Sequence, residues 1–199
     1  MTKFRLSVVI SVLILTIAVF VTDISAFARD CADLRRNVLR LHVIANSDSE
    51  ADQAVKLEVR DFILKETENR IDDAADKDEV KKYFDDNSEH LTALVDGFLA
   101  EKGFSYTSSI SLSHSYFETR EYDGNTLPSG DYDALRITLG KGEGKNWWCV
   151  MFPPLCISAA DGDELPAENY ALMQSGNKTG YKLKLKIVEW FRGLKKLFR

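Results

Sequence analysis

Hydrophobic and polar residues alternate along residues 38–45, which read VLRLHVIA. Alternation at every second position is typical of a β-strand with one buried face. The polar stretch NSDS, residues 46–49, follows directly and predicts a turn. Ser47 and Glu50 have the spacing of a capping box, so we expect a helix to begin at this turn.

Two stretches after this turn have helical spacing. In the first, charged residues separate a row of apolar ones: Ala51, Val55, Val59, Phe62 and Ile63. The second runs from about residue 78 to residue 102 and is predicted to break near Asn87 and Ser88. Gly103 is the expected end of this helical region, because glycine adopts the backbone conformation that terminates helices.

From Phe104 onward the apolar residues return to a period of two. Residues 110–116 and 135–139 are predicted strands, and turn residues lie between them at 123–124 and 128–130. The glycine-rich stretch 140–145 then leads directly into another apolar run, residues 147–152.

A short glycine-rich connection between two strands is most simply interpreted as the turn of a β-hairpin. The whole pattern therefore predicts an α+β fold: a single domain with a mainly antiparallel or mixed sheet packed against two or three helices.

The N-terminus has the pattern of an export signal. Lys3 and Arg5 precede an apolar run without charged residues, 6–21, and Ala26 and Ala28 have the spacing that signal peptidases recognise. We expect cleavage after Ala28. This divides the chain into a signal peptide, 1–28, and a single extracytoplasmic domain, 29–199. An uncleaved membrane anchor is the alternative, because the run is only slightly shorter than the roughly 18 to 20 residues that span a bilayer.

Charge is distributed unevenly along the chain. The net charge is -5, yet residues 182–199 hold seven Lys/Arg and one Glu, while residues 29–181 hold 17 basic and 29 acidic residues. An acidic body repels phosphate backbones, so no nucleic-acid partner is expected.

The basic segment 182–199 is predicted to be an amphipathic helix. Such helices bind anionic membrane surfaces, and a solvated, frayed end is the alternative. The candidate membrane-surface residues are Trp190, Phe191, Lys195, Lys196 and Phe198.

Export also changes the expected state of the cysteines, because thiols oxidise outside the cytoplasm. Cys149 and Cys156 are a candidate disulfide. Pro153 and Pro154 lie between them, where a cis proline bond would let the chain double back. Two buried reduced cysteines are the alternative, and Cys31 has no predicted partner.

Two adjacent tryptophans precede this loop. Trp147 and Trp148 point to opposite faces if the segment is a strand, so one is expected in the core and the other at the surface. A surface tryptophan beside a rigid Pro153–Pro154 turn is typical of protein interfaces. Trp147, Trp148, Pro153 and Pro154 are therefore candidate partner-binding residues.

No catalytic, cofactor-binding or metal-binding residue is nominated. The three histidines are far apart and form no zinc-binding motif. Residues 140–145 lack the order of a phosphate-binding loop. Acidic residues such as Asp48, Asp52 and Asp133 are interpreted as solvated. We therefore expect a protein that is not an enzyme and needs no cofactor.

Three long stretches of the sequence resemble one family. They are LRLHVIANSDSEADQAVKLEVRD, LPSGDYDALRITLGKGEGKNWWCVMFPPLC and KLKIVEWF, and the match extends over roughly residues 35–192. The chain resembles stage II sporulation protein R of endospore-forming bacteria. The resemblance implies a signal secreted from the forespore into the intermembrane space. There it would activate a membrane-embedded aspartic protease of the mother cell, which processes the sigma-E precursor.

The resemblance transfers motif positions rather than catalytic residues. Asn46, Ser47 and Asp48 match the family's turn after the first strand and are candidate partner contacts, with helix capping as the alternative. Residues 127–132 match a second motif, in which turn formation explains the glycine and proline. The alternative function is an extracytoplasmic cell-wall hydrolase with an unrecognised active site, which would act without a partner protease.

Overall fold

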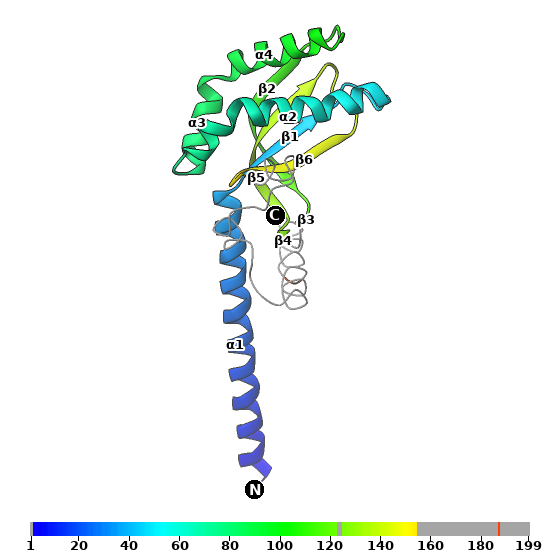
Figure 1. The fold of residues 1–199 in the computed structure, drawn as a ribbon. Coiled ribbons are helices and arrows are strands. Elements are labelled where there is room, and N and C mark those ends of the chain that lie inside the picture. Colours follow the sequence, from blue (N-terminus) through cyan, green and yellow to red (C-terminus); the bar gives the residue numbers. More distant parts are fainter. Residues whose placement is uncertain (1, 123–124, 155–186, 188–199) are drawn as a thin grey trace. The chain divides into compact units, whose positions relative to one another are not determined.

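The structure is a computed structural model that describes residues 2–122, 125–154 and 187 (Figure 1). Two units are described by themselves: the N-terminal helix as far as Leu34, and a body that begins at Arg35. Several candidate residues lie outside the described residues: Cys156, Trp190, Phe191, Lys195, Lys196 and Phe198. The predictions that rest on them remain predictions.

The N-terminal helix α1 runs over Thr2–Asn37 without interruption. From Phe4 onward it is long and apolar enough to span a membrane, and a signal sequence near an N-terminus has the same properties. Ala28, after which cleavage is predicted, lies within this helix, and its neighbours Phe27 and Cys31 are buried. Cleavage there requires the helix to unwind locally, so the membrane-anchor alternative stays open.

The body contains three helices and six strands among its described residues, and the predicted α+β class is confirmed. In chain order its elements are β1 (Leu39–Ile44), α2 (Glu50–Asp72), α3 (Lys77–Asp86), α4 (Ser88–Glu101), β2 (Ser108–Phe117), β3 (Arg120–Tyr122), β4 (Asn125–Leu127), β5 (Gly130–Leu139) and β6 (Asn146–Phe152). Strands β3 and β4 pair with each other, and the other four form a mixed sheet in the order β2-β5-β1-β6. Strand β1 is parallel to β5, and the other two pairings in that sheet are antiparallel.

The three body helices pack on one face of the sheet (Figure 1). On this helix-covered face, Leu41 of β1 lies between Leu135 of β5 and Cys149 of β6, and all three side chains belong to the main core. Alternation along each strand sends the intervening side chains to the other face. We call that side the second face; Arg40, His42 and Trp148 lie on it.

The predicted hairpin of β5 and β6 is wrong, because β1 lies between these strands. The connection 140–145 instead crosses the end of β1, where Gly144 N donates to Ala45 O at 2.9 Å and Glu143 N donates to Asn46 O at 3.2 Å. Two strand spacings amount to about 10 Å, which six residues span easily. The long antiparallel ladder joins β2 to β5, from Ser108 opposite Leu139 to Phe117 opposite Gly130.

Strand β1 is also more buried than its alternation predicted, because all six of its residues are buried. A central strand of a sheet is covered on both faces, whereas the alternating pattern predicted one solvated face. Arg40 is fully buried and His42 is 7% exposed.

The helix ends follow local chemistry closely. Asn87 separates α3 from α4, and Gly103 follows α4 with a φ of +86°, so both predictions are confirmed. The predicted capping box of Ser47 and Glu50 is wrong. Ser49 is the N-cap of α2, and its hydroxyl oxygen accepts from Asp52 N at 3.2 Å.

Candidate functional site

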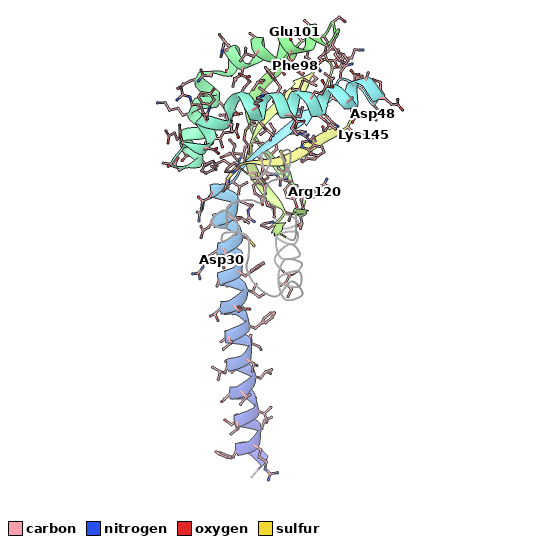
Figure 2. The ribbon with its side chains drawn as sticks, viewed as in Figure 1. Asp30, Asp48, Phe98, Glu101, Arg120 and Lys145 are labelled. Atoms are coloured by element: carbon pink, nitrogen blue, oxygen red, sulfur yellow. The ribbon has the colours of Figure 1, made fainter. Side chains whose placement is uncertain are left out.

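The Asn46–Asp48 turn is joined to two other parts of the body through its side chains. Asn46 donates through Nδ2 to Asp52 Oδ2 (3.0 Å) and accepts through Oδ1 from Lys141 N (3.0 Å). Asp48 Oδ1 accepts from Lys145 N at 2.7 Å, and Figure 2 shows these two residues close together. The turn therefore holds the end of β1 against α2 and the glycine-rich connection.

Asp52 is the centre of this network, which the sequence reasoning missed by treating it as a solvated carboxylate. It is 6% exposed. Ser47 Oγ donates to its Oδ2 at 2.5 Å, and Tyr106 donates to its Oδ1 at 2.6 Å. Its position three residues after Ser49, at the third helical position, was the local signal that it faces the turn.

The protonation of Asp52 follows from these contacts. Burial alone would raise its pKa, but hydrogen bonds from Ser47, Tyr106 and Asn46 outweigh burial and lower the pKa below its usual value. Burial and the neighbouring Asp52 carboxylate raise the pKa of Tyr106. The pair is therefore a carboxylate and a neutral phenol at neutral pH, which makes it a structural contact without a proton to exchange.

The glycine-rich connection docks closely on the turn. Gly140 and Gly142 have φ values of +54° and +64°, in the left-handed region that favours glycine. Lys56, which is 5% exposed, donates through Nζ to Gln53 Oε1 (2.7 Å) and to Lys145 O (3.1 Å). Residues 140–145 thus form a fixed structural turn whose backbone is used within the body.

Trp147 and Trp148 lie on opposite faces of β6, as predicted, but both are partly buried. Trp147 packs against the main core, and the Arg60 guanidinium lies 4.4 Å from its ring centroid. Trp148 stacks on His42 of the second face, with ring centroids 3.5 Å apart and an interplanar angle of 18°. The sequence predicted one tryptophan in the core and one at the surface, whereas both rings are partly buried.

The loop after β6 begins as the sequence suggested. The Phe152–Pro153 peptide bond is cis, Pro153 is buried, and Pro154 is partly buried. Cys149 is 7% exposed on the helix-covered face. Because Cys156 lies outside the described residues, its bridge to Cys149 remains a prediction.

A cationic and aromatic cluster occupies the second face. Arg40 Nε donates to Cys149 O at 3.4 Å, and the guanidinium lies 4.3 Å from the ring centroid of Phe117. Burial lowers the pKa of His42 to about 4; Asn146 opposes this shift through a hydrogen bond, and Arg136 adds to it. His42 is therefore neutral at neutral pH and stacks as an uncharged ring.

Acidification should destabilise the body through His42. A histidine in an unfolded chain has a pKa of about 6.5, so between pH 6.5 and 4 the unfolded state binds more protons. The stability contributed by neutral His42 is complete above pH 6.5 and falls as the pH approaches 4. Urea unfolding of wild type and His42→Gln at pH 7 and 4.5 measures the difference, with exposed His90→Gln as control. Equal pH dependence in wild type and His42→Gln would contradict the assignment.

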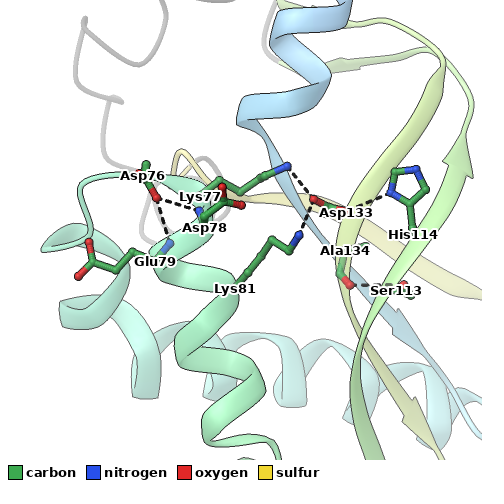
Figure 3. A network of polar contacts seen from close by, with 9 residues as sticks. All are labelled: Asp76, Lys77, Asp78, Glu79, Lys81, Ser113, His114, Asp133 and Ala134. Carbon is green, nitrogen blue, oxygen red and sulfur yellow. Dashed lines mark hydrogen bonds and ion pairs between the residues drawn. The ribbon is translucent and has the colours of Figure 1, made fainter.

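A second ionic cluster lies on the helix-covered side, between α3 and the strands β2 and β5 (Figure 3). Asp133 Oδ2 pairs with Lys77 Nζ (2.7 Å) and Lys81 Nζ (2.9 Å), while Oδ1 lies 3.0 Å from His114 Nδ1. Burial alone would raise the pKa of Asp133, but hydrogen bonds from Lys77, His114 and Lys81 hold it well below its usual value. This cluster holds α3 on the sheet, and no local sequence pattern indicated it, because its members come from α3, β2 and β5.

The side chains of these sites hold strands, helices and the glycine-rich connection together. Within residues 2–122 and 125–154, no group of three or more histidine, cysteine, aspartate or glutamate side chains is arranged to hold a metal ion. Asn46, Ser47 and exposed Asp48 use their side chains in hydrogen bonds within the body, whereas partly buried Trp148 lines a surface pocket. Among the described candidates, Trp148 thus lies where an external contact can form.

Comparison with known proteins identifies the family. The family model of stage II sporulation protein R matches residues 35–161. Stage II sporulation protein R of Bacillus subtilis (strain 168) is 36% identical over 119 residues, which are 60% of this chain and 53% of the relative. The chain thus matches about half the length of that relative, and no solved structure matches. The turn, the glycine-rich connection and the Trp147–Trp148 strand all fall inside the matched region, and the chain belongs to the stage II sporulation protein R family.

Proposed function

We propose that this protein is an exported sporulation signal that activates a membrane-embedded aspartic protease of the mother cell. The protease then processes the sigma-E precursor. Membership of the stage II sporulation protein R family carries the proposal and places the protein in sporulation. The apolar helix α1 supports it, because such a helix suits secretion or membrane targeting.

The proposed place of action is the intermembrane space between forespore and mother cell, reached by export from the forespore. The protein would contribute a folded surface and no catalytic group. The internal hydrogen bonds of the Asn46–Asp48 turn support the proposed folded surface, because they give this part of the body a fixed shape of the kind that recognition requires.

Reconstitution in a non-sporulating bacterium tests the proposal. The host coexpresses the mother-cell protease and the sigma-E precursor, either with the exported full chain or with a variant that lacks residues 2–28 and stays in the cytoplasm. We expect precursor cleavage only with the exported form, measured by immunoblot. Unchanged cleavage, with all proteins folded and correctly located, would refute activation and favour a function without this protease.

Three further parts of the proposal concern covalent state and location. They are cleavage after Ala28, a Cys149–Cys156 bridge and membrane contact by the basic segment 182–199. Intact mass of the exported protein, with and without reduction and thiol alkylation, measures the first two. Co-sedimentation with anionic vesicles, compared with a chain ending at Phe191, measures the third.

A further inference from the structure

The outer edge of β2 is one border of the main sheet, and the proposed function leaves it without a role. In the order β2-β5-β1-β6, β2 pairs with β5 alone among the described strands. The pairing runs from Ser108 opposite Leu139 to Phe117 opposite Gly130 without a register shift. The other side of such a strand presents backbone N–H and C=O groups that can pair with a further strand.

The register of β2 and β5 determines which backbone groups face outward. Thr107 O accepts from Gly140 N at 2.8 Å, so these two residues form a hydrogen-bonded pair of the ladder. Hydrogen-bonded and non-hydrogen-bonded pairs alternate along an antiparallel ladder. The odd-numbered residues of β2 therefore direct their backbone groups toward β5, whereas Ile110, Leu112 and His114 direct theirs away from it.

Ser108 confirms this assignment, because its N–H faces away from β5 and donates to Asp96 Oδ1 at 2.6 Å. Asp96 belongs to α4, so this helix closes the first outward position of β2. Within residues 2–122 and 125–154, the outward backbone groups of Ile110, Leu112 and His114 have no such partner. Three successive outward positions are thus open to another strand.

The opposite border of the sheet, β6, has features that discourage strand addition, and β2 has none of them. β6 is seven residues long, shifts its register against β1, and runs directly into Pro153 and Pro154. Short length, irregular register, prolines and charged side chains are the usual means by which edge strands avoid pairing. β2 is ten residues long and contains no proline, glycine, lysine, arginine or acidic residue. Its sequence therefore favours pairing at the outer edge.

The side chains along β2 define the pattern that an added strand must have. On the second face, Ser109 and Ser111 are exposed. On the helix-covered face, Leu112 is partly buried against the main core, and His114 is held by Asp133 (Figure 3). Cross-strand neighbours share a face of the sheet. An added strand would thus place apolar residues beside Leu112 and small or polar residues beside the serines.

The charge of the body favours a partner other than a second copy of this chain. Residues 29–181 hold 17 basic and 29 acidic side chains. Two acidic residues, Asp96 and exposed Glu89, lie on α4, which packs against β2. Two copies joined at β2 would bring like charges together, which disfavours association. A strand with neutral or basic residues suits this edge.

We propose that the outer edge of β2 binds an extended, non-acidic segment from the extracytoplasmic part of the partner protease as an additional strand of the sheet. The inference rests on the proposed function, because that function supplies the partner. Backbone hydrogen bonds to Ile110, Leu112 and His114 hold the segment, as in other cases of strand addition to a sheet edge. Side chains beside Leu112 and the serines set the register.

Proline at position 114 tests this pairing in the reconstituted host. His114→Pro removes an outward N–H, and edge strands tolerate proline where the N–H points away from the sheet. His114→Ala is the reference, because it loses the same contact with Asp133 but keeps the N–H. Precursor cleavage with His114→Pro should be about tenfold or more below that with His114→Ala, since one hydrogen bond is lost and the proline ring obstructs the added strand. Equal cleavage with the two folded variants would overturn the inference.

A lysine variant tests the same edge with every backbone N–H retained, in case proline prevents folding. Ser111→Lys should reduce cleavage, because lysine on an edge strand opposes strand addition. Ala93→Lys, at an exposed position of α4, is the matched control and should leave cleavage unchanged. Secretion and a thermal midpoint equal to those of wild type show that each variant is folded. Wild-type cleavage with folded Ser111→Lys would contradict pairing at β2.

Photocrosslinking separates failure of the edge contact from failure of the proposed function. A benzoylphenylalanine at position 111, on β2, should crosslink to the coexpressed protease, and the same group at position 93 should not. Mass spectrometry should place the crosslink in a non-acidic segment outside the membrane. Such a crosslink without precursor cleavage would refute activation and keep the edge contact. Cleavage without a crosslink, or a crosslink only to a second copy of this chain, would overturn the edge contact.

Discussion

Replacing Asp52 with alanine should destabilise the body by about 3 to 5 kcal/mol, since each polar group left without its partner in a buried site costs about 1 to 3 kcal/mol. The carboxylate accepts hydrogen bonds from Asn46 Nδ2, Ser47 Oγ and Tyr106 OH, and it is 6% exposed. Alanine removes the shared acceptor and leaves three donors around an empty position. Urea unfolding at pH 7 measures the loss as a lower midpoint.

Two further variants make this result specific. Asp52→Asn keeps the shape and one acceptor oxygen, so its loss of stability should be intermediate. Glu66→Ala removes an exposed carboxylate from the same helix and should change stability by less than about 0.5 kcal/mol. An unfolding free energy for Asp52→Ala within about 1 kcal/mol of wild type would show that water replaces the carboxylate and that the network is not structural.

The contrast between Asp52 and the helix ends shows what sequence patterns can predict. The break at Asn87 and the end at Gly103 depend on residues within one helical turn, and both were predicted correctly. The partners of Asp52 include Tyr106, 54 residues away in the chain. A pattern read along the chain contains no such pair, so the buried carboxylate was interpreted as a solvated one.

Strand order is nonlocal in the same way. Alternation identified β1, β2, β5 and β6 as strands, but the position of β1 between β5 and β6 depends on which strand is buried on both faces. Arg40 and His42 concealed that burial, because charged and titratable residues are seldom found in the interior. Aromatic rings cover them: Phe117 lies over Arg40, and Trp148 stacks on His42.

Contacts between distant parts of the chain also explain the role of the candidate residues in the Asn46–Asp48 turn. Asn46, Ser47 and Asp48 were nominated either as partner contacts or as helix-capping residues, and the structure gives them a structural role of a third kind. They join β1 to α2 and to the glycine-rich connection. A long motif within the matched family region can therefore reflect the assembly of the fold, and the surface that meets a partner has to be sought where side chains remain available.

The glycine-rich connection carries the second large prediction, which is that Gly144→Ala should destabilise the body by about 3 kcal/mol. A Cβ at Gly144 would lie 2.2 Å from Ser47 O and 2.6 Å from Ser47 C, which are backbone atoms of the turn. The turn cannot move aside without loss of the Asn46 and Asp48 hydrogen bonds to the connection. Urea unfolding should therefore show a lower midpoint, and the loss should be smaller when Asp48→Ala has already broken one of these bonds.

Gly97 provides the matched control, because the same substitution there should have the opposite sign. It is an exposed position of α4, and a Cβ would meet nothing within 4 Å. Alanine exceeds glycine in helix propensity by about 1 kcal/mol, so Gly97→Ala should stabilise the body. If both variants changed stability in the same direction, the close approach at Gly144 would not be the cause. Opposite signs would show that Gly144 is required because the connection packs directly on the backbone of the Asn46–Asp48 turn. This packing requirement explains a glycine in residues 140–145 without a phosphate-binding role.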